Sequence, residues 1–168
     1  LYLPGPKYNL SQTRRHAGIM DALSEANVPA SNIREIDYHT VFGSTAESTS
    51  SYKPYEELFF PVNYTAVIGF NDLQSYSAME ILQKKGYRIP EDISLISFDH
   101  LRKTHTYLPP LTSIADNSEK SIADTAVSIL LDKIRNPSSE ISSKVLPVSI
   151  FDGHTTGPIN ETFAHSFE

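Results

Sequence analysis

Short apolar runs alternate along the chain with segments in which apolar residues recur at the spacing of a helix. The apolar runs predict β-strands, and these are Leu1–Pro4, Ile33–Asp37, Thr65–Phe70, Ile93–Phe98 and Val145–Phe151. The run at 65–70 is continuous rather than alternating, which is typical of a strand buried on both faces. Strands that alternate with helices predict an α/β fold built on a parallel sheet, with helices covering it on both sides.

Segments between the strands have the signals of helices. The first helix follows the turn GPKYN, and Ser11 is its predicted N-cap. The second runs from Asp72 to Lys85 and stops at Gly86, and Asp72 is its predicted cap. The third, Ser118–Arg135, has a strongly apolar side, which consists of Ile122, Ala126, Ile129, Leu130 and Ile134.

Two further stretches have no helical pattern. The sequence YLPPLTSI at 107–114 is expected to be extended, because each proline restricts its own φ and biases the residue before it away from helix. The residues after Phe151 are polar, and we expect this tail to be frayed.

The composition excludes several classes of protein. The 14 Lys and Arg residues are outnumbered by 20 acidic residues, so the chain has a net charge of −6 and lacks the basic surface of a nucleic-acid-binding domain. The absence of cysteine excludes disulfides and thiolate chemistry. No apolar run is long enough to span a membrane. The 168 residues start without Met inside a predicted strand, and we therefore expect a fragment of a longer protein.

Polar residues follow several of the predicted strands. Asn71 and Asp72 follow one strand, Asp99 another and Tyr38 a third, while Arg15 lies in the first helical turn after a fourth. Ligands of such sheets bind outside the carboxyl ends of the strands, so these residues are expected to meet at one edge. Each also has an ordinary explanation: a helix cap for Asp72, a turn or loop residue for Asn71 and Asp99, a solvent-facing side chain for Arg15, and core packing for Tyr38.

The chemistry of this set favours binding over catalysis. Amide, carboxylate and guanidinium groups match the adjacent hydroxyls of a small polyol, and an aromatic ring can cover the apolar face of a sugar. No nucleophile with a base beside it is recognisable, which argues against an enzyme. The six histidines lack metal-binding spacing, and no glycine-rich phosphate loop is present, so we expect neither a metal nor a cofactor.

Several strings together resemble the effector-binding core of the LacI/GalR family of bacterial transcription regulators. They are LYLPGPKYNLSQTRRHAGIMDAL, TAVIGFNDLQSYSAMEILQKKGYRIPEDISLISFDH and YLPPLTSI, in this order. The family pattern S-x-x-x-R-x-x-G is met by Ser11, Arg15 and Gly18. The resemblance covers most of residues 1 to 157.

The resemblance implies a sensor of the type I periplasmic-binding-protein-like fold, in which two lobes close on a sugar, nucleobase or phosphoprotein signal. Arg15, Asn71 and Asp99 match polar effector contacts of the family. Tyr38 falls where some members place an aromatic that stacks on the sugar, and Ser11 is a further possible contact. By this resemblance the ligand-binding residues are Arg15, Asn71, Asp99, Tyr38 and Ser11.

The resemblance also implies how the chain is divided and what it associates with. Residues 1–114 correspond to the C-terminal lobe, 115–151 to the segment crossing to an N-terminal lobe that is mostly absent, and 152–168 to a return strand and tail. Tyr76 and Tyr107 match the family's dimer interface, with core packing as the alternative.

The resulting hypothesis is a cytoplasmic, homodimeric sensor without membrane contact. A sugar-like effector in its cleft modulates operator DNA binding by a helix-turn-helix outside this chain. The alternative is a sugar-binding protein of a transport system with the same fold.

Overall fold

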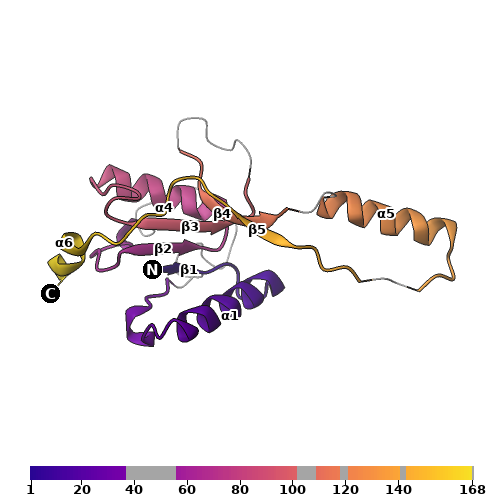
Figure 1. Cartoon of the computed structure of the whole chain (residues 1–168), viewed down its shortest axis with the longest axis horizontal. Coiled ribbons are helices and arrows are strands. Elements are labelled where there is room, and N and C mark those ends of the chain that lie inside the picture. The colour runs from indigo at the N-terminus through magenta and orange to yellow at the C-terminus, as the bar shows by residue number, and fades with distance from the viewer. Residues whose placement is uncertain (37–55, 102–108, 118–120, 141–142, 168) are drawn as a thin grey trace.

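A mostly parallel sheet forms the centre of the computed structural model, which describes residues 1–36, 56–101, 109–117, 121–140 and 143–167 (Figure 1). Its strands are β1 (Tyr2–Leu3), β2 (Ala66–Gly69), β3 (Ser94–Phe98), β4 (Thr112–Asp116) and β5 (Val148–Phe151). The helices are α1 (Leu10–Glu25), α4 (Asp72–Lys84), α5 (Ile122–Arg135) and α6 (Glu161–Ala164), with 3-10 turns η1 (Ala30–Asn32) and η2 (His165–Phe167). The predicted α/β class is confirmed.

The five strands lie in the order β1-β2-β3-β4-β5. The first four are parallel, and β5 is antiparallel to β4, with Ile150 opposite Ile114. The predicted strand at 33–37 is reduced, within the described residues, to one parallel bridge between Glu35 and Tyr2 at the outer side of β1. Glu35 therefore pairs on one side of β1, and β2 pairs on the other side. The direction in which successive segments are added to the sheet reverses at β1. Open α/β sheets bind their ligands at such a point.

Helices α1 and α4 lie on opposite faces of the sheet (Figure 1). Neighbouring side chains of a strand point to opposite faces, so β1 can contact both helices. Leu1 and Leu3 belong to the core cluster that includes the buried side of α4. Tyr2, between them, donates its hydroxyl hydrogen to Gln12 Oε1 of α1 at 3.0 Å. The two helices thus pack against alternate residues of β1.

The core lies between α4 and the sheet, and burial along the strands alternates. Val67, Leu95, Met79 and Leu82 are fully buried, whereas Ile68 and its neighbours on the other face are only partly so. The prediction that 65–70 is buried on both faces is therefore wrong. The physical reason is the position of α1, which lies beyond β1 and whose only buried residue is Gln12.

Both predicted N-caps are displaced. Asn9, not Ser11, caps α1, and its Oδ1 accepts hydrogen bonds from the backbone N–H of Ser11 at 2.8 Å and of Gln12 at 3.3 Å. Asn71, not Asp72, caps α4 by accepting from the N–H of Gln74 at 3.0 Å. In both helices an asparagine with extended backbone reaches the free amides of the first turn. The predicted stop at Gly86 is confirmed, with φ at +90°.

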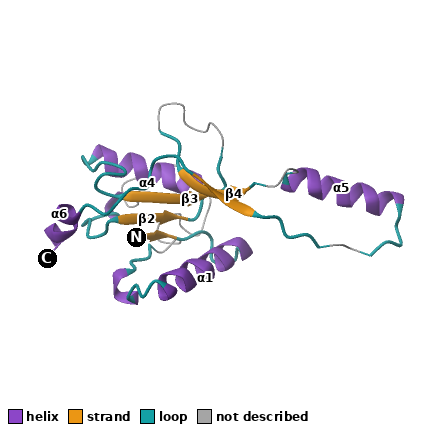
Figure 2. Cartoon of the chain, viewed as in Figure 1, coloured by secondary structure: helices purple, strands orange, loops and turns teal. Residues whose placement is uncertain are grey.

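Helix α5 projects away from the sheet (Figure 2). Ser121 caps it, and the earlier start predicted at residue 118 lies outside the described residues. No residue of α5 is buried, and its apolar stripe is open: Ile122, Leu130 and Ile134 are 64%, 58% and 64% exposed. The stripe does not pack on residues 1–114 of its own chain.

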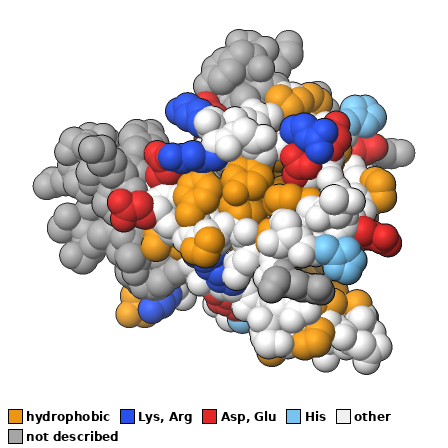
Figure 3. All heavy atoms as spheres, turned by 90° about the vertical axis from the view of Figure 1, so that its left-hand side faces the viewer, with side chains coloured by type: hydrophobic (Ala, Val, Ile, Leu, Met, Phe, Trp, Pro, Cys, Tyr) orange, Lys and Arg blue, Asp and Glu red, His pale blue; other side chains and the backbone are white. Residues whose placement is uncertain are grey.

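The tail is docked rather than frayed, which corrects the prediction. The Gly157 N–H donates to Ser94 Oγ at 3.1 Å, and Phe163 packs edge-on against Tyr87 with ring centroids 5.9 Å apart. Phe167 in turn packs against Phe163 at 5.0 Å. Figure 3 views the side on which α6 lies and shows hydrophobic side chains gathered at its centre with charged ones around them. None of the described helices is long and apolar enough to cross a membrane.

Candidate ligand site at the carboxyl edge of the sheet

Arg15 and Asp99 meet at the carboxyl edge of the sheet, although 84 residues separate them. The Arg15 Nη2 donates to Asp99 Oδ1 at 2.6 Å, and its Nη1 donates to the Phe70 carbonyl at 2.6 Å. The guanidinium also lies over the rings of Phe70 and Phe98, 4.9 and 4.8 Å from their centroids. Two hydrogen bonds and two aromatic faces fix its orientation, while the Arg15 and Asp99 side chains stay 23% and 36% exposed.

The backbone at Asp99 is strained. Its φ is +95° and that of His100 is +47°, both in the left-handed region that side chains other than glycine rarely adopt. Such residues cost about 1–3 kcal/mol each and persist where the surroundings hold them. Here the Asp99 N–H donates to the Ile114 carbonyl and the His100 N–H to Ser113 Oγ, both at 2.9 Å. This conformation directs the Asp99 carboxylate toward Arg15.

Asp72 is not the helix cap that its sequence position predicted, and it does not face the ligand site. Its side chain is 2% exposed. One carboxylate oxygen accepts a hydrogen bond from the Ser113 hydroxyl at 2.8 Å and the other from the Leu101 N–H at 2.5 Å. Asp72 therefore ties the first turn of α4 to strand β4 and to the loop after β3.

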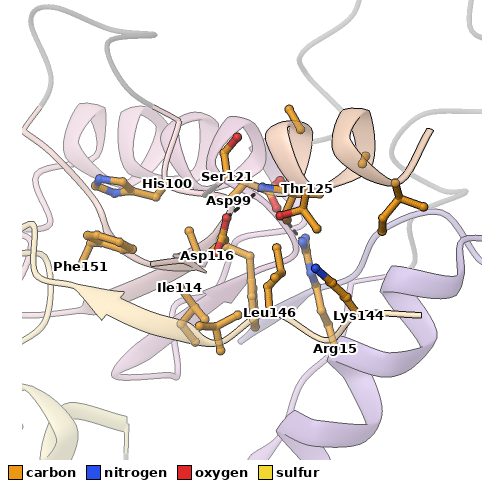
Figure 4. A pocket seen from close by; sticks show the side chains of 17 residues that line it. Arg15, Asp99, His100, Ile114, Asp116, Ser121, Thr125, Lys144, Leu146 and Phe151 are labelled. Atoms are coloured by element: carbon orange, nitrogen blue, oxygen red, sulfur yellow. Dashed lines mark hydrogen bonds and ion pairs between the residues drawn. The ribbon is translucent and has the colours of Figure 1, made fainter. Parts of the chain in front are cut away.

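A pocket of about 870 Å³ opens beside the Arg15–Asp99 pair (Figure 4). One wall is the edge of the sheet, and the other is α5 with the segment that returns from it toward β5, including Lys144 and Leu146. Its polar groups come from both walls, and they include Arg15, Asp99, His100, Asp116, Thr125 and Lys144. The remaining lining is largely apolar, with Ile114, Leu146 and Phe151 among the contributors. The pocket can thus bind a molecule that has both hydroxyl groups and apolar faces.

The structure brings together two of the five predicted ligand-binding residues, Arg15 and Asp99. Asn71 caps α4 and does not line this pocket. Ser11 is exposed in the first turn of α1 and also lies outside the pocket lining. Tyr38 falls outside the described residues. A ligand role for these three stays a prediction.

Sequence reasoning missed His100 and the residues of the returning segment. The His100 ring stacks on Phe151 with centroids 4.1 Å apart and planes 14° apart, joining the loop after β3 to the end of β5. The signal was its position next to Asp99. Asp116 and Lys144 gave no such signal, because each belongs to a segment whose place beside the sheet edge is set only by the fold.

The predicted interface residues differ in what the structure describes. Tyr76 is 6% exposed and belongs to the core cluster, so its side chain offers little area to a partner. Burial raises its pKa, and the Asp72 charge adds to the effect. In the single chain, Tyr76 therefore packs in the core, which was the alternative for this residue. Tyr107 lies outside the described residues. Within the described part of the chain, no three acidic or histidine side chains are grouped as a metal site requires.

Comparison with known proteins identifies the class. The family model described as "Periplasmic binding protein-like domain" matches residues 1–156. The chain therefore belongs to the periplasmic binding protein-like domain family, and within it to the effector-binding domains of the LacI/GalR regulators.

Particular relatives support this assignment. The HTH-type transcriptional repressor PurR of Escherichia coli O139:H28 and that of Shigella boydii serotype 18 are each 33% identical over 144 residues, which is 84% of this chain and 40% of theirs. The chain thus spans less than half the length of these curated relatives.

Solved structures of LacI family proteins have a similar fold. A LacI family transcriptional regulator from Enterococcus faecium with bound ribose has a TM-score of 0.75 at 26% identity, over 95% of this chain and 57% of that one. A dimeric Lac repressor with an 11-residue C-terminal deletion has a TM-score of 0.72 at 26% identity, over 95% of this chain and 55% of that one.

Proposed function

We propose that this chain is the signal-sensing part of a bacterial transcription regulator and that it binds a small sugar-like effector beside Arg15 and Asp99. The observation that carries the proposal is the ion pair itself, fixed at the carboxyl edge of a parallel sheet and lining a pocket. The ribose-bound LacI family relative supports a sugar as the class of ligand.

The pair suits a polyol for a simple chemical reason. A sugar hydroxyl both donates and accepts hydrogen bonds. The carboxylate can accept from it, and the guanidinium can donate to it. The Arg15–Asp99 bond uses one oxygen of the carboxylate, Oδ1, and the second oxygen has two lone pairs for a ligand hydroxyl. The apolar wall at Ile114 and Leu146 can cover the C–H face of the sugar.

The proposal extends to partners outside the chain. We infer a homodimer that acts in the cytoplasm and binds operator DNA through a helix-turn-helix beyond these residues, with the effector changing that affinity. The PurR relatives and the dimeric Lac repressor support this reading. We infer binding rather than catalysis, since the described pocket residues present an ion pair and no recognisable pairing of a nucleophile with a base.

The test is ligand binding by the intact protein. A thermal-shift screen against sugars comes first, because a ligand at 100 times its Kd adds about 2.7 kcal/mol of stability. For a sugar that binds, Asp99→Ala should cost about 1.5–3 kcal/mol, or about 10- to 150-fold in Kd by calorimetry. Arg15→Ala should cost a similar amount.

Arg14 supplies the matched control, since it is an exposed arginine on the same helix and outside the pocket. Arg14→Ala should leave the Kd unchanged. A folded Asp99→Ala variant with wild-type affinity would remove Asp99 from the site. If no sugar shifts the melting curve at any concentration tested, the sugar class itself is wrong.

A further inference from the structure

The loop that follows β3 is held by hydrogen bonds from consecutive backbone amides. The Asp99 N–H binds the Ile114 carbonyl at 2.9 Å, a contact that continues the pairing of β3 with β4. The next two amides instead reach side chains: His100 N–H donates to Ser113 Oγ at 2.9 Å and Leu101 N–H to Asp72 Oδ2 at 2.5 Å. The left-handed part of the loop thus depends on two side chains from other elements.

Those two side chains act as one unit. Both are buried, Asp72 at 2% exposed and Ser113 at 0%. The Ser113 hydroxyl donates to Asp72 Oδ1 at 2.8 Å. An ionised carboxylate accepts hydrogen bonds and cannot donate them, so it directs the hydroxyl hydrogen toward itself and leaves the serine lone pairs for the His100 N–H. Asp72 therefore holds the loop twice, directly at Leu101 and through Ser113 at His100.

We propose that Asp72 and Ser113 are positioning residues of the ligand site, which hold the backbone of Asp99 and His100 in the left-handed conformation that directs the Asp99 carboxylate to Arg15. The inference rests on the proposed function and adds to it residues that do not touch the pocket. Without the two side chains, the amides of His100 and Leu101 lose their partners, and the loop is free to relax to the more favourable φ below zero.

A neighbouring pair of hydroxyls provides the comparison. Ser97 lies opposite Ser113 in the register of β3 and β4, and it is also 0% exposed. The Ser75 hydroxyl of α4 donates to Ser97 Oγ at 2.8 Å. This pair also joins α4 to the sheet, but it makes no hydrogen bond to residues 99–101, the described part of the loop. Ser113→Ala and Ser97→Ala thus remove the same group at the same burial from adjacent strands.

The first measurement is amide hydrogen exchange in the intact protein without ligand. Exchange at His100 should be about tenfold faster in Ser113→Ala, and exchange at Leu101 about tenfold faster in Asp72→Ala, the loss of protection expected for about one hydrogen bond in each case. Ser97→Ala should exchange as the wild type does at these residues. Equal exchange in Ser113→Ala and Ser97→Ala would overturn the proposal.

The second measurement is affinity for D-ribose by calorimetry, which a merely structural role would not change in folded protein. Ser113→Ala should weaken binding by about tenfold, and Ser97→Ala should not. Faster loop exchange with unchanged affinity would overturn the positioning role. If the wild type does not bind D-ribose, the choice of sugar is wrong, but the proposal for the loop is not affected. The hydrogen-exchange comparison then tests by itself whether Asp72 and Ser113 hold the loop.

Discussion

The docking of the tail gives a prediction whose magnitude follows from the structure. Phe163 lies between Tyr87 and Phe167, with ring centroids 5.9 and 5.0 Å away, and it packs against the core cluster. Asn160 fixes the approach, since its Oδ1 accepts from the Phe163 N–H at 3.1 Å and its amide donates to Asp92 at 3.3 Å. Replacement of Phe163 by alanine should release the tail.

The expected cost combines two contributions. Full burial of a phenylalanine side chain is worth about 1.5–3 kcal/mol, and Phe163 is partly buried, so only part of that applies. The edge-to-face pair with Tyr87 adds about 0.5–1.5 kcal/mol. Phe163→Ala should therefore lower the free energy of unfolding by about 1–3 kcal/mol.

Urea denaturation of the intact protein, followed by pulse proteolysis, measures this change. Ile159 is the matched control, because it belongs to the same tail and is 61% exposed. Ile159→Ala should stay within about 0.5 kcal/mol of the wild type. Equal midpoints for the two variants would mean that the tail does not dock and that the aromatic contacts contribute no stability.

Glycines and one surface pair give the remaining predictions. A Cβ on Gly69 would lie 1.9 Å from Ser75 Oγ, so Gly69→Ala should destabilise by about 1–3 kcal/mol in urea, and less when Ser75→Ala is added. Gly18, with no atom within 4 Å of an added Cβ, should gain about 0.5–1 kcal/mol as alanine in the same assay. The Arg88 hydrogen bond lowers the pKa of Asp92, so its stabilisation is present above the ordinary carboxyl pKa and is lost as pH falls through the lowered one. Asp92→Asn should flatten the acid side of the stability-pH profile, and an unchanged profile would contradict this.

The sequence was sufficient for most of the elements, namely β1, β2, β3, β5, α1, α4 and α5, and for the central pair of the site. Strands and helices can be recognised from local periodicity. Because the carboxyl ends of parallel strands lie at the same edge of a sheet, their positions predict that Arg15 and Asp99 lie close together. The strand at 33–37 was over-predicted because its apolar pattern does not reveal that its described residues pair at the outer edge through a single bridge at Glu35.

The role of Asp72 was beyond sequence reasoning. Asn71 and Asp72 are both good caps, and their order alone does not tell which one turns inward. The partners that decide the matter, Leu101 and Ser113, lie 29 and 41 residues away. The tail was misjudged for a similar reason, because the polar residues around Phe163 conceal a docking contact to Tyr87 across the fold.

The exposed stripe of α5 and the pocket belong to one problem. Ile122 lines the pocket and continues the stripe through Leu130 to Ile134, all more than half exposed. Among the described residues, only the Arg15 and Asp99 side of the pocket is backed by a packed core, since α5 buries none of its residues. An apolar surface of this kind favours association, so whatever covers the stripe also fixes the second wall of the pocket. The family resemblance predicts that residues 115–151 cross to another lobe, and on that prediction a lobe that covers α5 would also change the affinity for the ligand.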